Sequence, residues 1–226
     1  GGREWLVDKA GAVVTQGQAK DNAAEVFTVL KVLDENAVEA EDEVAITIPT
    51  EGHSGVTLRN LVNILASKER LIAKAMGTIG QPIVDPTIVE KINAARLKTI
   101  EDFFEAGGSE ASPGLVITQD TITFHWFTAT LNPEIVQAYV QFAAAVNDMA
   151  LSLKHSSPHA TETENEKYSF RVFLLRLGIV GEKYSATRKL FLGRLEGNMA
   201  FKTQEQAKEA AKKRKKKPTV AEEAEI

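Results

Sequence analysis

The chain has 226 residues, of which 43% are hydrophobic and 26% charged, and it contains no cysteine. This composition is typical of a globular protein with a real core, and it argues against a disordered chain. The lack of cysteine excludes disulfides, zinc–thiolate sites and thiol catalysis, and it favours a reducing compartment. No apolar run approaches the roughly 20 residues of a membrane span, so we expect a cytoplasmic protein without a membrane partner.

The N-terminal part of the chain is acidic, and most of its C-terminal part is basic. Residues 1–150 carry 11 Lys and Arg against 21 Asp and Glu, a net charge of −10. Residues 151–217 carry 16 against 7, a net charge of +9, and the last nine residues add three glutamates. Such asymmetry indicates either two surfaces with different tasks or a self-complementary assembly.

The first predicted elements are a hairpin, a helix and a strand. Residues 5–14 are expected to form a short hairpin that turns at Asp8–Gly11, and its abrupt start suggests that a preceding element is missing. Asp21 is a suitable N-cap for a helix over 22–36, because Val26, Leu30 and Leu33 supply an apolar side. Alternating apolar residues predict a strand over 44–49.

A long helix and two short ones are predicted next. Apolar side chains form one stripe over 57–76, with Thr57 as the expected cap and Gly77 as the stop. The segment 78–86 contains Gly and Pro and is expected to be a connection. Short helices are expected at 86–95 and 98–106, followed by a glycine-rich loop over 107–114.

A second hairpin and a second long helix follow. Residues 115–127 alternate between an apolar and a hydroxylic face and are expected to turn at Gln119-Asp120. Asn132 and Pro133 begin a helix in which apolar residues recur at spacings of three and four: Ile135, Tyr139, Phe142, Val146, Met149 and Leu153. We interpret this seam as the core side of the helix, with a dimer seam as the alternative.

The most distinctive stretch is a helix pair at 165–202. Its first helix, 166–177, is apolar nearly all round and is therefore expected to be buried on several sides. The turn Gly178–Gly181 joins it to a second helix over 182–195. This arrangement fits a helix-turn-helix, in which the second helix reads the major groove. Because the outward face mixes glutamates with basic residues, a plain helical hairpin in the core is the favoured interpretation.

A lysine-rich segment after the pair supplies most of the positive charge. A third helix is expected over 201–217, before the acidic tail. Phosphate backbones attract such runs through counterion release, although a solubilising tail would have the same composition. The candidate nucleic-acid-binding residues are Lys183, Arg188, Lys189, Arg194, Lys202, Lys208, Lys212, Lys213, Arg214, Lys215, Lys216 and Lys217.

Motifs for catalysis or metal binding are weak. His155 and His159 have the spacing of metal ligands on a helix, but Pro158 lies between them. His53 has no evident partners for a nucleophilic triad, and His125 is interpreted as a structural residue. We expect no metal, no cofactor and no catalytic residues. An enzyme with a pocket lined by His125, Trp126 and buried carboxylates is the least favoured hypothesis.

Three blocks of the sequence resemble a known family. They are ITIPTEGHSGVTLRNLVNILASKERLIAKAMG (46–77), LVITQDTITFHWF (115–127) and NEKYSFRVFLLRLGIVGEKYSATRKLFLGRLEGNMAFK (165–202). Together they resemble the uncharacterised "virulence-related protein" family of Gram-positive gut bacteria and their mobile elements. The resemblance implies an intracellular bacterial protein from a phage-like or conjugative context, shortened at its N-terminus, and it supplies no catalytic residues.

These observations predict an α+β fold with a small, mostly antiparallel sheet covered by helices. We expect an acidic α+β domain at 1–154, a linker at 155–166, the helix pair at 167–202 packed on the core, and a basic helix with an acidic tail at 203–226. The expected function is that of a non-enzymatic accessory protein of a mobile element. It would bind DNA or RNA mainly through its C-terminal basic surface. The alternative is a protein-interaction module or homodimer without nucleic-acid binding.

Overall fold

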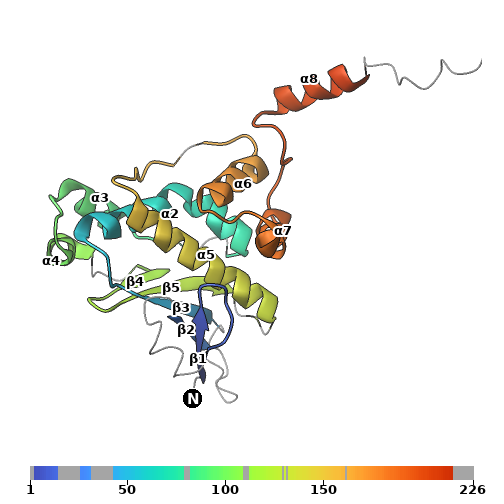
Figure 1. Cartoon of the computed structure of the whole chain (residues 1–226). Helices are drawn as coiled ribbons and strands as arrows, with labels where there is room; N and C mark the ends of the chain where they lie inside the picture. The colour runs from blue at the N-terminus through green and yellow to red at the C-terminus, as the bar shows by residue number, and fades with distance from the viewer. Residues whose placement is uncertain are drawn as a thin grey trace, which may run out of the picture.

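The computed structural model describes residues 3–14, 26–31, 43–78, 82–108, 112–128, 130, 132–160 and 162–215. At 3–5, 26–31, 43, 204, 207, 211 and 213–215 it describes the backbone alone. Within these ranges the chain forms an α+β fold, in which helices cover a small antiparallel sheet (Figure 1). None of the described helices is both long and apolar enough to cross a membrane.

The sheet has five strands in the order β1-β2-β3-β5-β4, and every neighbouring pair is antiparallel. The strands are β1 (Arg3–Asp8), β2 (Val26–Lys31), β3 (Glu43–Pro49), β4 (Leu115–Ile117) and β5 (Thr121–Thr128). The predicted strand at 44–49 is confirmed as β3. Because β3 lies between β2 and β5, it joins the N-terminal strands to the later hairpin.

The predicted helix over 22–36 is wrong, because its described part, Val26–Lys31, is strand β2. The segment contains β-branched and aromatic residues, which favour strands. It also pairs with β1 on one side and β3 on the other. Hydrogen bonding to two distant strands therefore overrides the helical spacing; residues 15–25 and 32–42 lie outside the described ranges.

Both hairpin turns form where the sequence predicts them. In the first, the Asp8 carboxylate accepts hydrogen bonds from the backbone N–H groups of Ala10 and Ala12 at 2.9 Å, and Gly11 has a positive φ of 81°. Its return arm forms only the isolated bridge between Val7 and Val13, and β1 pairs instead with β2. The second hairpin, β4 and β5, is confirmed with its apolar face buried: Leu115, Ile117, Ile122 and Phe124 are at most 5% exposed.

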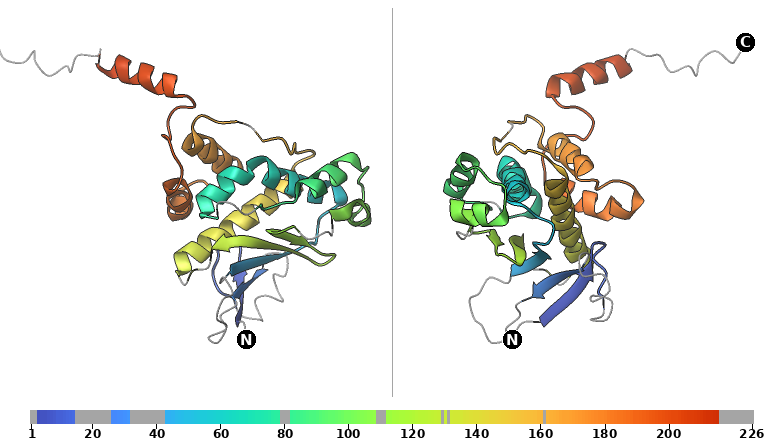
Figure 2. Two further views of the ribbon diagram at one scale, coloured as in Figure 1. Left: turned by 180° about the vertical axis from the view of Figure 1, so that it is seen from behind. Right: turned by 60° about the vertical axis from the view of Figure 1, so that its left-hand side comes forward.

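Two long helices, α2 (Gly55–Met76) and α5 (Pro133–Ser152), lie together over one face of the sheet (Figures 1 and 2). Helix α2 ends at Gly77 as predicted, but its N-cap is Ser54, which forms a capping box with Thr57. Helix α5 begins with the predicted cap, Asn132, followed by Pro133.

The predicted apolar seam of α5 faces the core of the same molecule. Tyr139, Phe142 and Val146 are at most 1% exposed, and Ile135, Met149 and Leu153 are partly buried against them. The interpretation as a core helix is therefore confirmed for this seam, and its buried residues are not on a surface that a second copy could contact.

Two shorter helices, α3 (Pro86–Ala94) and α4 (Ile100–Phe103), lie beside the N-terminal half of α2, as Figure 1 shows. Helix α4 continues into a π-helical turn, Phe104–Gly108, in which Gly107 has a positive φ of 96°. The two predicted short helices are thus present, and the second is shorter than expected.

The C-terminal helix pair consists of α6 (Glu166–Arg176), a 3₁₀ turn (Glu182–Tyr184) and α7 (Ser185–Gly193). It packs on α5 through aromatic rings: the Phe142 centroid lies 6.3 Å from Phe170, 6.3 Å from Phe173 and 5.4 Å from Phe191. One buried apolar cluster accordingly extends from Val7 to Leu195. Helix α8 (Gln204–Lys215) projects from this body (Figure 1).

The segment predicted as a linker, 155–166, is tied to α2 at its start. The Asn60 amide donates to the carbonyl of Leu153 at 2.7 Å and accepts from the backbone N–H of Ser156 at 3.0 Å. The Asn63 amide donates to the carbonyl of Ser156 at 2.8 Å. Both asparagines are fully buried, so these bonds fix the path of the chain from α5 towards α6.

Candidate nucleic-acid interface

The turn between α6 and α7 is built from local signals. Asn165 caps α6 by accepting a hydrogen bond from the backbone N–H of Tyr168. Gly178 and Gly181 both have positive φ, near 80°, a conformation that side chains with a Cβ rarely adopt. The Arg188 guanidinium donates to the carbonyl of Gly181 at 2.8 Å and to that of Ile179 at 3.4 Å. These bonds hold α7 at a fixed position against α6.

A groove of about 390 Å³ opens between the two helices. Its lining residues are Lys167, Arg171, Ser185, Arg188, Lys189, Leu192, Gly193 and Met199. Four of the eight are cationic and none is acidic. Lys167 and Arg171 are one helical turn apart on α6, and Arg188 and Lys189 come from α7, so the groove combines charges from both helices.

The groove cations differ from Arg70 and Lys74 of α2, which pair with Glu166, in having no acidic partner among the described residues. Within the described chain, Lys167, Arg171 and Lys189 form no ion pair, and the guanidinium of Arg188 binds backbone carbonyls. The positive charge of the groove is therefore not neutralised by neighbouring carboxylates. An unpaired basic groove of this kind attracts anions, and phosphate above all.

The structure places the remaining predicted residues in different surroundings. Lys183 is exposed, with its ammonium 4.7 Å from the centre of the Tyr184 ring. Arg194 donates to the carbonyls of Ala75 and Met76 and so caps the C-terminus of α2. Lys202 lines a second groove on another side of α6. Of the predicted residues whose side chains the structure describes, Arg188 and Lys189 alone line the groove between the helices.

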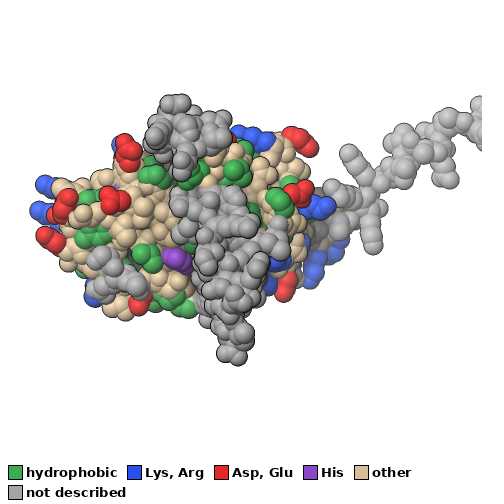
Figure 3. All heavy atoms as spheres, turned by 90° about the horizontal axis from the view of Figure 1, so that it is seen from below, with side chains coloured by type: hydrophobic (Ala, Val, Ile, Leu, Met, Phe, Trp, Pro, Cys, Tyr) green, Lys and Arg blue, Asp and Glu red, His purple; other side chains and the backbone are tan. Residues whose placement is uncertain are grey.

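The basic helix α8 carries the lysine run. Lys208 and Lys212 are exposed on it, and the backbone of Lys213, Arg214 and Lys215 continues the helix. Lys216 and Lys217 lie outside the described residues. Figure 3 shows the molecule from below. Several Lys and Arg side chains are visible in it at one end, which is the end that carries α7 and α8 in Figure 1.

Lys167 and Arg171 are groove residues that the sequence analysis missed. The helix at 166–177 was expected to be buried on several sides, whereas in α6 the buried residues are Phe170, Phe173 and Leu174, and Leu175 is 40% exposed. A spacing of four between Lys167 and Arg171 was the available signal, because such residues share one face of a helix.

His53 forms hydrogen bonds that join two helices. Nε2 of His53 lies 2.9 Å from Oδ1 of Asn147, and Nδ1 lies 3.1 Å from Oγ1 of Thr57, so the ring links α2 to α5. Burial lowers the pKa of His53, although the hydrogen bond to Asn147 acts in the opposite direction. No group of three or more His, Asp or Glu side chains within the described ranges is arranged to hold a metal ion.

Comparison with known proteins assigns neither a family nor a function to the chain. No family model, no curated protein and no solved structure matches the chain.

Proposed function

We propose that the protein binds nucleic acid through the phosphate backbone, with the groove between α6 and α7 as the main contact surface. The observation that carries this proposal is the lining of the groove: Lys167, Arg171, Arg188 and Lys189 without a carboxylate among the lining residues. Lys208 and Lys212 on α8 extend the basic surface. The resemblance seen in the sequence would place this activity in a non-enzymatic accessory protein of a mobile element.

The groove is better suited to contacts with the phosphate backbone than to contacts with the edges of the bases. A recognition helix presents several side chains at its N-terminal end to base edges in the major groove. Here the segment before α7 is a 3₁₀ turn with Glu182 exposed, and the guanidinium of Arg188 is already bound to the turn. The other groove cations are long, flexible side chains suited to phosphate. We therefore expect binding with little sequence preference.

Binding of a protein partner is the second candidate, and the exposed apolar side chains favour it. Leu175 is 40% exposed, Val180 45% and Met199 53%, and all three belong to the helix pair or the segment after it. Met199 also lines the basic groove. An acidic segment with apolar anchors would fit this surface, since such anchors supply most of the affinity in protein interfaces.

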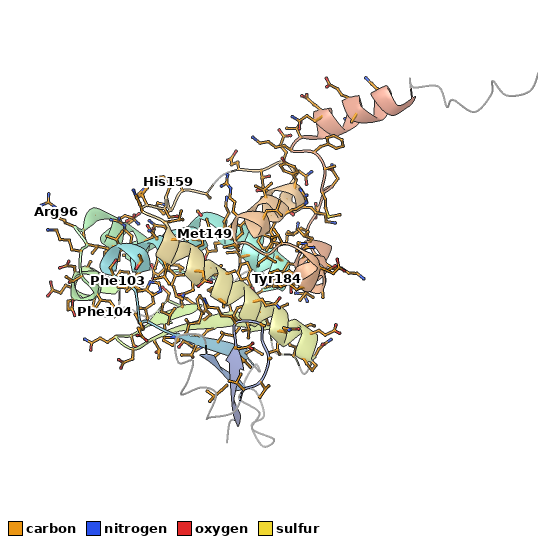
Figure 4. All side chains as sticks on the ribbon, in the orientation of Figure 1. Arg96, Phe103, Phe104, Met149, His159 and Tyr184 are labelled. Atoms are coloured by element: carbon orange, nitrogen blue, oxygen red, sulfur yellow. The ribbon has the colours of Figure 1, made fainter. Side chains whose placement is uncertain are left out.

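Titration of a labelled duplex at low salt, followed by fluorescence anisotropy, tests the proposal. The double variant Arg171→Gln/Lys189→Gln removes two groove cations that form no ion pair with described residues. Its matched control is Arg96→Gln/Lys98→Gln, which removes two exposed cations near α4; Figure 4 shows Arg96 at the opposite end of the molecule from Tyr184. We expect the groove variant to bind at least about tenfold more weakly, because two phosphate contacts are lost.

The control should bind the duplex like the unmodified protein. Equal losses in both double variants would show that net charge, and not the groove, carries the affinity. If the unmodified protein does not bind duplex DNA, single-stranded DNA or RNA at low salt, the proposal fails and the protein-partner candidate takes its place.

A further inference from the structure

A second groove, separate from the first, lies on another side of α6. Its volume is about 350 Å³, within the range of roughly 300–1,000 Å³ usual for small-molecule sites. Its lining residues are Lys68, Glu162, Thr163, Tyr168, Ser169, Val172, Phe173, Arg176 and Lys202. They come from α2, α6 and the segments before α6 and after α7, so the groove forms only when distant parts of the chain meet.

Lys68 of this groove contrasts with two later cations of α2, Arg70 and Lys74, which have acidic partners. Lys74 lies 2.7 Å from one carboxylate oxygen of Glu166 and 3.1 Å from Glu196, and Arg70 lies 3.6 Å from Glu166. Lys68, on the same helix, forms no ion pair or hydrogen bond with any described residue. Its charged neighbour is another cation, Arg176.

The fold shifts the pKa values of Lys68 and Lys74 in opposite directions. Burial, and after it the positive charge of Arg176, lowers the pKa of Lys68. Hydrogen bonds to Glu166 and Glu196 raise the pKa of Lys74. The fold thus neutralises one lysine of α2 and leaves the other beside a like charge, an arrangement that an anionic ligand would relieve.

The rest of the lining indicates what kind of anion fits. Lys202 adds a third cation, and the hydroxyls of Tyr168 and Ser169 form no hydrogen bond with described residues. Three cations and two hydroxyl donors match the several acceptor oxygens of a phosphate dianion better than the two oxygens of a carboxylate. Val172 and Phe173 provide an apolar wall beside these donors. Glu162, the only acid among the lining residues, pairs with none of the three cations.

We propose that this groove binds a small phosphate monoester, with its phosphate between Lys68 and Arg176 and its organic group against Val172 and Phe173. The site is independent of the nucleic-acid proposal, because it uses a different face of α6 and shares no lining residue with the first groove. The phosphate could belong to a free metabolite or to a nucleic-acid strand, and the choice of ligands in the experiment separates these sources.

Isothermal titration of the full chain with AMP, adenosine and inorganic phosphate tests this site. We expect AMP to bind with a Kd below about 1 mM and adenosine at least about tenfold more weakly, since the phosphate supplies the charged contacts. Lys68→Met and Arg176→Gln should each weaken AMP binding by about fivefold or more. Lys202→Gln alters an exposed side chain outside any helix and gives a third test that does not depend on the packing of α2.

Two controls separate this site from the nucleic-acid groove. Arg171→Gln/Lys189→Gln should leave AMP binding unchanged, and Lys68→Met should leave duplex binding unchanged. The proposal is overturned if AMP does not bind, if adenosine binds as well as AMP, or if none of the three groove variants weakens binding. Displacement of AMP by a duplex without terminal phosphates would also overturn it, because the cations would then belong to the nucleic-acid surface.

Discussion

Phe142 of α5 contacts aromatic rings from both helices of the C-terminal pair. Its ring is completely buried, and it contacts Phe170 and Phe173 of α6 and Phe191 of α7. We expect Phe142→Ala to lower the free energy of unfolding by about 3–5 kcal/mol, the usual loss for a fully buried Phe. That is a large part of the roughly 5–15 kcal/mol that holds a typical domain together. It corresponds to a fall in Tm of about 6–20 °C for a chain of this size.

Urea unfolding followed by circular dichroism measures this loss, with Phe104→Ala as the matched control. Phe104 also has an aromatic neighbour, since its ring centre lies 5.7 Å from that of Phe103, but it is only partly buried (Figure 4). The control should cost about 1 kcal/mol. If Phe142→Ala costs no more than Phe104→Ala, the helix pair does not rely on this aromatic cluster.

Three further outcomes are expected from side chains with defined partners. Arg194→Ala should lower stability by about 1 kcal/mol, measured by urea unfolding, because the carbonyl of Ala75 loses its side-chain donor and that of Met76 keeps only the Thr128 hydroxyl; duplex binding should be unchanged. Stability should fall as the pH drops below about 6.5, since the pKa of His53 is lower in the folded than in the unfolded protein; His53→Gln should flatten this part of the pH profile. Lys68→Met should leave the Tm unchanged or raise it, and Lys74→Met should lower it, because only Lys74 has carboxylate partners; equal losses would contradict this contrast.

Short-range signals in the sequence were sufficient to locate several helices. Asn132 and Pro133 mark the start of α5, and Gly77 marks the end of α2, because caps and stops act within one turn of the helix. The hairpin at 115–127 was equally accessible, since its alternating pattern and its turn are both local.

Strand β2 could not be predicted in the same way. Val26, Leu30 and Leu33 have helical spacing, and the same stretch also contains the β-branched residues of a strand. The choice between the two is made by β1 and β3, which supply hydrogen bonds from either side. Pairing with strands from other parts of the chain is not visible in a local window of sequence.

Only part of the candidate site could be predicted from the sequence, for a related reason. A count of basic residues found Arg188 and Lys189, but it could not show that Arg194 caps α2 or that Arg188 closes the turn. Because the helix at 166–177 was expected to be buried on several sides, Lys167 and Arg171 were not among the predicted residues. Whether a cation is free or paired depends on which carboxylates the fold places beside it.

The salt dependence of duplex binding tests the central claim most directly. If Lys167, Arg171 and Lys189, the groove cations that are not bound to the turn, contact phosphates, log Kobs should fall with log[salt] with a slope of about −3, before any contribution from α8. Arg171→Gln/Lys189→Gln should make this slope shallower by about 2, while Arg96→Gln/Lys98→Gln should leave it unchanged. A slope that is the same in the groove variant and in the unmodified protein would contradict the account.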